Sequence, residues 1–355
     1  MDMLLSKPVL PPGYLDTSVG EPHIVRHHLM QTFDISEYHL PQETHMWEYP
    51  PPNGHKPLVD LLERKYKAQV IITNGAKQAL GACFYALKQM GKERVGMKLP
   101  YWALLPQLAK MHDMECSFAD PDINFTKLNA QPDCKELRLP QWHDAYLLLA
   151  PNNPCGHCDS PNQLIHTAKE YKDKGIPFIH DAAYYTHTYL PFVHTLPPIG
   201  DVQIYSISKM LGLSGLRLGF VVCPNPEFYK LILNYMEHMT VGVSITSQMF
   251  LYSLMDRMEN YPSLTGRFEG LSSLALDTAK AIIKQVNPEI LEVGDVEKTN
   301  GMFGWFKVGP KADFDKAKIN VVGGELFGMP GYIRMNLAFS VDQMRDIVQR
   351  LNSVI

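Results

Sequence analysis

The chain has 355 residues, of which 45% are hydrophobic and 20% charged, and its formal net charge at pH 7 is −4. These values predict a folded protein with a large domain and a smaller one, and they exclude a disordered chain or a strongly basic nucleic-acid-binding protein. No uncharged apolar stretch reaches 18 residues and no secretion signal is visible, so we expect a cytoplasmic protein. The six scattered cysteines favour reduced thiols over a disulfide framework.

The regular part of the pattern begins after residue 55. Residues 1–55 are rich in Pro, Gly and His and are predicted to form an extended arm belonging to the smaller domain. Helical spacing then covers 57–67 and 75–90, with a helix after Tyr101 and another after Pro161, whereas strand patterns cover 70–73, 94–99, 145–150, 177–180, 202–206 and 216–222. This alternation predicts an α/β domain at 56–230, a mainly parallel sheet with helices on both faces.

The C-terminal part has a different pattern. Two long helical patterns run from about Pro226 to residue 286, the first continuing the large domain to about residue 260. Residues 301–308 and 331–338 then read as strands and 341–351 as a helix. We therefore predict a smaller α+β domain at 261–355, completed by the N-terminal arm.

The most informative stretch is residues 206–219, which read SISKMLGLSGLRLG. Lys209 lies in the connection between two predicted strands, where open α/β sheets place their sites. Burial and the like charge of Arg217 would disfavour the ammonium form and leave an amine that can form an imine. The alternative is a solvated lysine in a Ser/Gly-rich turn.

Polar side chains at other strand ends suit the same chemistry. Asn153 follows the strand that ends at Ala150 and can donate a hydrogen bond to an oxygen on a ring. Asp181 ends the next strand and can pair with a protonated ring nitrogen, while Tyr184 can reach the same oxygen as Asn153. The alternatives are an ordinary turn and a helix cap.

Three further features suit a phosphate, a planar ring and a carboxylate. Residues 73–77 turn from a strand into a helix, whose free N–H groups can bind a phosphate, although an ordinary turn has the same sequence. Trp102 follows a strand and can stack on a ring or belong to the core. Arg334 stands inside an apolar strand, where it needs an anionic partner such as a carboxylate.

Residues 206–219 closely resemble the S-x-S-K-x-x-G-x-x-G-x-R-x-G signature around the cofactor lysine of class I and II aminotransferases, the pyridoxal-phosphate enzymes of fold type I. Further segments resemble family motifs in the same order: 16–22, 47–50 with Gly54, and 323–328 before 332–338. The resemblance spans residues 15–339. The sequence departs from the family at Gly323, where a proline is frequent, and the chain is shorter than many members.

The resemblance implies a role for each matched residue. Lys209 would carry pyridoxal 5'-phosphate as an internal aldimine, with Asp181 at the pyridine nitrogen, Asn153 and Tyr184 at the phenolate oxygen, and Trp102 stacked on the ring. The phosphate would be held by Gly75, Ala76, Ser206, Ser208 and Arg217, and by Tyr49 of a neighbouring subunit. Lys77 is a further candidate for cofactor binding, although relatives vary at its position. The substrate would contact Arg334, Gly20 and Asn153. The resemblance thus implies a homodimer that shares its active sites.

The hypothesis that follows is transamination between an L-amino acid and a 2-oxo acid, with Lys209, Tyr184 and Asp181 as the catalytic residues. A decarboxylase or lyase with the same cofactor is the alternative, and Arg334 favours transamination because it holds the substrate carboxylate. A cofactor-binding regulatory module is disfavoured, since no basic helix-turn-helix pattern precedes residue 55. Cys155 and Cys158 leave a zinc or thiol-redox site as an outside option, although no metal is expected. The sequence does not identify the side chain of the substrate.

Overall fold

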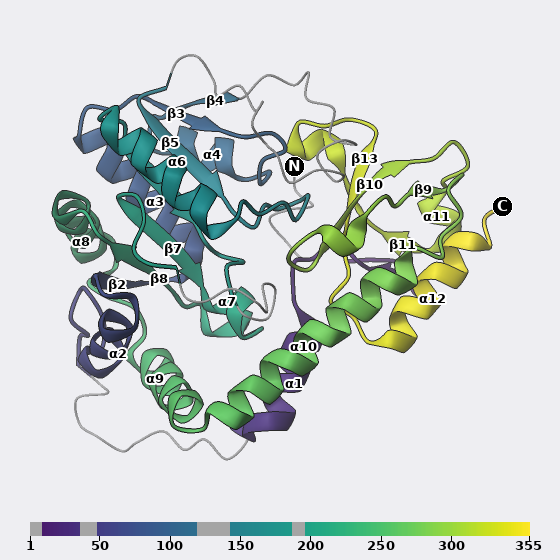
Figure 1. Cartoon of the computed structure of the whole chain (residues 1–355), viewed down its shortest axis with the longest axis horizontal. Helices are drawn as coiled ribbons and strands as arrows, with labels where there is room; N and C mark the ends of the chain where they lie inside the picture. The colour runs from purple at the N-terminus through teal and green to yellow at the C-terminus, as the bar shows by residue number, and fades with distance from the viewer. Residues whose placement is uncertain (1–8, 36–47, 119–142, 187–195) are drawn as a thin grey trace.

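The structure is a computed structural model that describes residues 9–35, 48–118, 143–186 and 196–355 (Figure 1). Its largest sheet has seven strands in the order β2-β8-β7-β6-β5-β3-β4. Every neighbouring pair is parallel except those of β8, which runs antiparallel to β2 and β7. The prediction of a mainly parallel sheet is confirmed. The strands are β2 (Gln69–Thr73), β3 (Arg94–Met97), β4 (Glu115–Phe118), β5 (Ala145–Leu149), β6 (Phe178–Asp181), β7 (Val202–Ser206) and β8 (Gly219–Cys223).

Helices cover this sheet on both faces. In Figure 1, α6 (Pro161–Asp173) lies in front of the sheet and α3 (Gly75–Gln89) behind it. The connections through α3 and α6 cross the sheet in opposite directions, and right-handed crossovers therefore place these helices on opposite faces. The remaining helices around the sheet are α2 (Lys56–Tyr66), α4 (Leu105–Lys110) and α8 (Pro226–Thr240).

The N-terminal segment is folded, so the prediction of an extended arm is wrong for part of it. Residues His23–Phe33 form helix α1, because Val25, Leu29 and Phe33 recur every four residues and make a buried apolar stripe. The stripe packs on α10 (Pro262–Ile283), where the Phe33 and Phe268 rings lie 6.5 Å apart. Upstream of this helix, β1 (Leu15–Asp16) pairs in parallel with β11 (Ile319–Asn320). The N-terminal segment is thereby joined to the C-terminal part of the chain.

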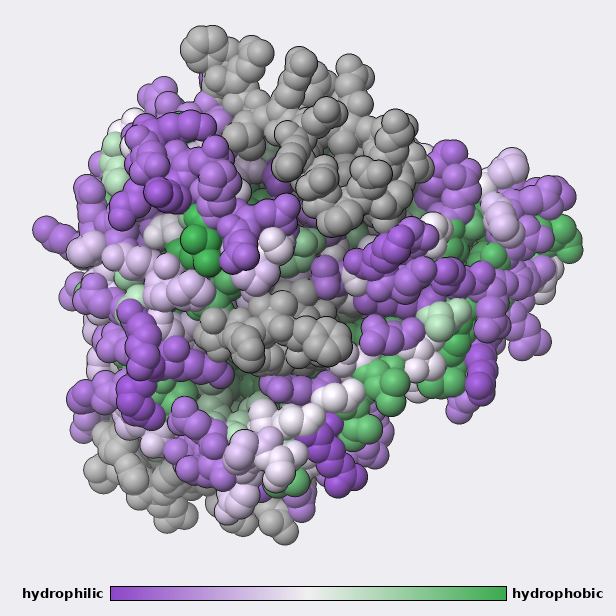
Figure 2. Space-filling model, in the orientation of Figure 1, coloured by the Kyte–Doolittle hydropathy of each residue, from purple (hydrophilic) through white to green (hydrophobic). Residues whose placement is uncertain are grey.

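The C-terminal part has its own antiparallel sheet, in the order β12-β13-β10-β9, and its own apolar core. Its strands are β9 (Leu291–Glu292), β10 (Phe303–Val308), β12 (Val322–Gly323) and β13 (Tyr332–Asn336), and its helices are α11 (Phe314–Ala317) and α12 (Val341–Asn352). The 3-10 turns η5 (Val296–Lys298) and η6 (Gly324–Phe327) connect them. Figure 2 shows hydrophobic residues along α10, where Leu271 and Leu274 are exposed.

The structure differs from the prediction in two further places that matter for the chain path. Three helices occupy 226–283, not two, because α9 (Ile245–Asn260) is separated from α8 by a turn at Gly242 and from α10 by Pro262. The strand predicted at 216–222 begins only at Gly219. Arg217 ends the 3-10 turn η4 (Ser214–Leu216) with a left-handed φ of +53°, which no strand accommodates.

Candidate functional site

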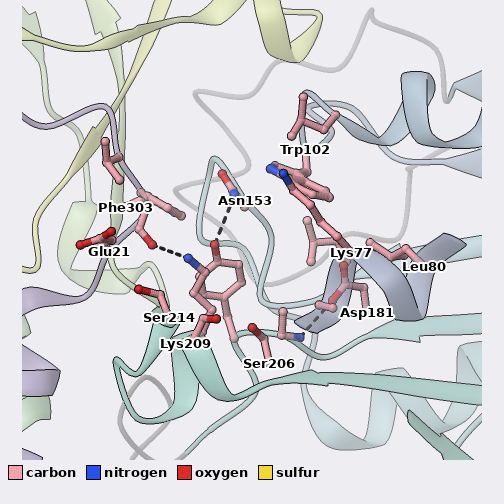
Figure 3. Close-up of a pocket in the computed structure, with 18 of the residues that line it drawn as sticks. Glu21, Lys77, Leu80, Trp102, Asn153, Asp181, Ser206, Lys209, Ser214 and Phe303 are labelled. Atoms are coloured by element: carbon pink, nitrogen blue, oxygen red, sulfur yellow. Dashed lines mark hydrogen bonds between the residues drawn. The ribbon is translucent and has the colours of Figure 1, made fainter. Parts of the chain in front are cut away.

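A cavity of about 470 Å³ lies at the carboxyl ends of the parallel strands, between the large sheet and the antiparallel sheet (Figure 3). Its lining comes from segments far apart in the chain: residues 18–21, the start of α3, the ends of β5, β6 and β7, and strands β10 and β13. Twelve of the predicted site residues line it, namely Gly20, Ala76, Lys77, Trp102, Asn153, Asp181, Tyr184, Ser206, Ser208, Lys209, Arg217 and Arg334.

Lys209 enters the cavity from the single helical turn α7 (Ile207–Met210), which follows the end of β7. Its Nζ donates a hydrogen bond to the Gly20 carbonyl and lies 6.0 Å from the centre of the Tyr184 ring. Burial, and then the charge of Arg334, lower the pKa of the Lys209 ammonium to about 8. Arg217 acts in the same direction but less strongly, so the main like charge is not the one the sequence indicated.

Asp181 ends β6 and is 3% exposed. Its Oδ1 accepts a hydrogen bond from the Ala183 backbone N–H at 3.1 Å. Burial raises the pKa of this carboxyl to about 7. A cation opposite the carboxylate, such as a protonated ring nitrogen, would favour its ionised form.

Three side chains form a hydrogen-bonded row across the cavity. Arg334 Nη1 donates to Asn153 Oδ1 at 3.1 Å, and Asn153 Nδ2 donates to Tyr184 Oη at 3.3 Å. Arg334 Nη2 donates to the Ser18 carbonyl, and the Phe303 ring centre lies 4.3 Å from the guanidinium carbon. Arg334 Nε is buried with no hydrogen-bond partner in the described part of the chain. An incoming anion would compensate this buried cation.

The opposite end of the cavity suits a phosphate. Ala76, Lys77, Ser206, Ser208 and Arg217 all line it. Burial and the like charge of Arg217 lower the pKa of Lys77.

Gly75 is not part of the lining, yet it shapes this end. A Cβ at Gly75 would lie 2.9 Å from Arg217 Nη2, and the φ of Gly75 is +75°. The missing side chain therefore leaves room for the guanidinium.

Two aromatic residues of the prediction have contrasting positions. Trp102 lines the cavity after β3, with Lys77 Nζ 5.7 Å from its ring centre. Tyr49 is 86% exposed and lies outside the cavity lining. Its predicted phosphate contact requires a second subunit and stays a prediction.

Sequence reasoning missed several lining residues, among them Glu21, Leu104 and Ser214. Glu21 lies within the N-terminal motif at 16–22, so that motif was the available signal. Ser214 likewise lies within the lysine motif at 206–219, at one of its variable positions. Leu104 carries no such signal, because an isolated leucine occurs throughout the chain.

The charges of the lining fit pyridoxal phosphate and a carboxylate substrate. Four cationic side chains (Lys77, Lys209, Arg217 and Arg334) face only two acidic ones, Glu21 and Asp181. The surplus of two positive charges (four minus two) calls for anions. Asp181, buried at the end of β6, can face a ring nitrogen.

The two cysteines considered for a zinc or thiol-redox site, Cys155 and Cys158, make ordinary hydrogen-bond contacts. Cys155 Sγ lies 3.2 Å from Asn152 Oδ1, and Cys158 Sγ lies 3.4 Å from the Asp159 carbonyl oxygen. Among the described residues, no three His, Cys, Asp or Glu side chains gather where they could hold a metal ion. Within those same residues, no helix is both long and apolar enough to cross a membrane.

Comparison with known proteins places these features in a family. The family model "Aminotransferase class I and II" matches residues 37–351. A probable aspartate/prephenate aminotransferase of Aquifex aeolicus is 25% identical over 82% of this chain and 77% of its own length. The solved aspartate aminotransferase of Thermotoga maritima shares the fold with a TM-score of 0.72 at 19% identity, over 96% of this chain and 91% of that one. The solved tyrosine aminotransferase of Leishmania infantum shares the fold with a TM-score of 0.74 at 16% identity, over 99% of this chain and 94% of that one.

Proposed function

This chain belongs to the class I and II aminotransferases, a family of pyridoxal-phosphate-dependent enzymes, and we propose that it moves an amino group between an L-amino acid and a 2-oxo acid with Lys209 as the point of cofactor attachment. The observation that carries the proposal is the position of Lys209. Its amine lines the cavity, and burial together with the charges of Arg334, Arg217 and Lys77 lowers its pKa to about 8. A lysine in that state supplies a neutral amine near neutral pH.

The lining residues would hold the cofactor as follows. Asp181 would keep the ring nitrogen protonated, and Asn153 Nδ2 and Tyr184 Oη would donate hydrogen bonds to the ring oxygen. Trp102 would cover one face of the ring. The phosphate would be enclosed by Ala76, Lys77, Ser206, Ser208 and Arg217, with Gly75 leaving room for the arginine.

The catalytic role of the chain itself is to move protons and hold the substrate. Bound pyridoxal phosphate supplies the electron sink that makes the α-proton of the substrate acidic. Arg334 would bind the α-carboxylate with its guanidinium, and Lys209 Nζ would remove the α-proton and later return a proton. The same Arg334 charge that binds substrate lowers the pKa of Lys209, which favours the basic form of the amine.

Transamination is favoured over decarboxylation by Arg334. A carboxylate bound to a buried arginine gains most of its stabilisation as an anion, so its loss as CO₂ would leave that cation unpaired. The test is to supply purified protein with pyridoxal phosphate, a set of L-amino acids and 2-oxoglutarate. We expect amino-acid-dependent formation of glutamate. Release of CO₂ or ammonia without oxo-acid dependence would instead identify a decarboxylase or lyase.

We also infer that the working unit is a homodimer. Tyr49 is 86% exposed, and its neighbour Pro50 packs on the turn between α8 and α9, where a Cβ at Gly242 would lie 2.8 Å from Pro50 Cγ. Val241 in this turn is 44% exposed and has a φ of +60°, a costly conformation for a β-branched residue. Buried Gln248 links the two segments, accepting from the His55 N–H and donating to the Val243 carbonyl, both at 2.7 Å.

A rigid surface with exposed apolar side chains is what a second copy would cover. With a chain mass of 40.2 kDa, light scattering after gel filtration should give about 80 kDa for the wild type. The charge introduced by Val241→Asp should shift the protein toward the monomer, whereas Ile165→Asp on α6, at 40% exposure, should not. A wild-type monomer would contradict the dimer.

A further inference from the structure

We propose that the amino donor of this enzyme carries an aromatic or large aliphatic side chain and not a second carboxylate. This proposal rests on the proposed function and names the substrate class of the same cavity. It follows from which side chains surround Arg334 and from how the charges of the lining are shared.

The first argument is the apolar surface beside Arg334. The side chain of an amino acid leaves the same carbon as its α-carboxylate, so it must lie within a few ångströms of the arginine that binds that carboxylate. Phe303 packs on the guanidinium at 4.3 Å and meets the Tyr184 ring edge-on at 5.7 Å. Val19 follows Ser18, whose carbonyl accepts from Arg334, and also lines the cavity.

These apolar residues are fixed in place. Phe303 is 2% exposed, and the carbonyl of Val19 accepts a hydrogen bond from Asn336 Nδ2 at 2.9 Å. Leu104 adds an apolar side chain to the same lining. A ring or branched aliphatic group placed against the Phe303 ring beside Arg334 would be removed from water without losing a hydrogen bond.

The second argument is that each cationic side chain of the lining already has a proposed role. Lys77 and Arg217 serve the phosphate, Lys209 attaches the cofactor, and Arg334 binds the α-carboxylate. The described lining that one chain supplies holds these four cations, so a cation for a distal carboxylate would have to come from outside that lining.

The lining instead carries Glu21, whose carboxylate lies 3.9 Å from His23 Nδ1 and 3.8 Å from Arg26 Nη1. These basic side chains compensate Glu21 only in part, since its charge still acts to raise the pKa of Lys209, so a second substrate carboxylate would meet a like charge in the cavity. This cost falls on aspartate and glutamate but not on phenylalanine or leucine.

Two measurements test the proposal. The first is kcat/KM for the half-reaction of the holoenzyme with L-phenylalanine, L-leucine and L-aspartate, followed by the cofactor absorbance. The second is calorimetric binding of two unreactive carboxylates, 3-phenylpropionate and succinate, to the same holoenzyme. We expect phenylalanine to exceed aspartate at least about tenfold and 3-phenylpropionate to bind correspondingly tighter than succinate.

A charge introduced beside Arg334 sharpens the test. Val19→Lys should improve succinate binding relative to 3-phenylpropionate, whereas Leu274→Lys, at a residue 63% exposed on α10, should leave the ratio unchanged. Aspartate turning over as fast as phenylalanine, or succinate binding as tightly as 3-phenylpropionate in the wild type, would overturn the proposal. If no donor converts the cofactor, the proposed function fails, while the ratio of the two carboxylates still decides the present inference.

Discussion

The two ends of the cavity are built in different ways. The cofactor end is formed by neighbouring strands of one sheet, with Asp181 at the end of β6, Ser206 at the end of β7 and Lys77 in the first turn of α3. The substrate end joins Arg334 on β13 to the Ser18 carbonyl, 316 residues away in the chain, and adds Phe303 from β10. Parallel topology is sufficient to assemble the first end, whereas the second exists only when the N- and C-terminal segments pack together.

Lys209 connects the two ends. Its amine donates to the Gly20 carbonyl at the substrate end, and its pKa responds more to Arg334 than to Arg217. Because Lys209 is the link between the ends, substitutions at either end should show which effects on substrate binding and on cofactor attachment are separate and which pass through this lysine.

The largest expected effect is that of Lys209→Ala, which removes the group shared by both ends. Loss of the attachment point and of the general base should lower kcat/KM by at least about 10³-fold. Borohydride should no longer fix the cofactor covalently to the chain, as mass spectrometry would show. Lys284→Ala, at a side chain 46% exposed, is the matched control. Normal turnover of the Lys209 variant in the absence of added amines would refute the assignment.

Arg334→Gln should weaken substrate binding while the final extent of covalent cofactor loading is retained. Because the buried guanidinium is expected to bind the α-carboxylate, kcat/KM should fall about 100-fold, with covalent cofactor loading retained. Steady-state kinetics and borohydride fixation measure the two properties separately. Arg345→Gln, whose side chain is 69% exposed, should change neither. An equal loss of cofactor loading would show that the two ends are not separable.

Asp181→Asn should affect the stability of the cofactor end in a pH-dependent way. Burial raises the pKa of Asp181 to about 7, above its unfolded value, so its favourable contribution is complete below about pH 4 and is lost as pH rises through 7. The apoprotein variant should therefore gain stability over wild-type apoprotein between pH 5 and pH 8, by about 3 kcal/mol. Urea unfolding at the two pH values measures this gain. The 94%-exposed Asp342 supplies a control in Asp342→Asn, and a gain independent of pH would contradict the assignment.

The rate of covalent cofactor attachment to apoprotein should rise with pH through a midpoint near 8, because the neutral amine of Lys209 is the reacting form. Arg334→Gln should move this midpoint upward, since it removes the strongest like charge acting on the lysine. Stopped-flow absorbance across pH 6–10 measures both values, with Arg345→Gln again as the control. An unchanged midpoint would show that the substrate end does not act on Lys209.

The smallest effect should come from Tyr184→Phe, which removes the hydroxyl between the two ends. The hydroxyl accepts one hydrogen bond from Asn153 at 3.3 Å, and loss of one such bond costs about 1 kcal/mol, or a rate change of about fivefold. Steady-state kinetics would detect it, with Tyr261→Phe, at 55% exposure, as the control. A loss of 10³-fold would instead mark the hydroxyl as an essential proton carrier.

Local patterns predicted most of the fold. Strand β7 and helix α3 follow the expected residues closely, because hydrophobic periodicity and turn residues act over a few neighbours. Helix α1 was missed because its stability comes from burial on α10, and isolated helices of this length are marginal in water. Similarly, strand β8 begins only at Gly219 because Arg217 has a left-handed backbone conformation. The apolar residues of this segment do not reveal that conformation.

The sequence by itself determined the proposed attachment lysine and its neighbours, because Ser206, Ser208, Lys209 and Arg217 lie in one short segment whose spacing is readable. It also placed Asp181 and Asn153 at strand ends. Only the tertiary structure decided that Arg334 contacts Asn153 and Ser18, that Phe303 faces the cavity, and that Arg334 is the main charge lowering the pKa of Lys209. These are long-range contacts, and their electrostatic strength depends on burial and distance, which no linear spacing encodes.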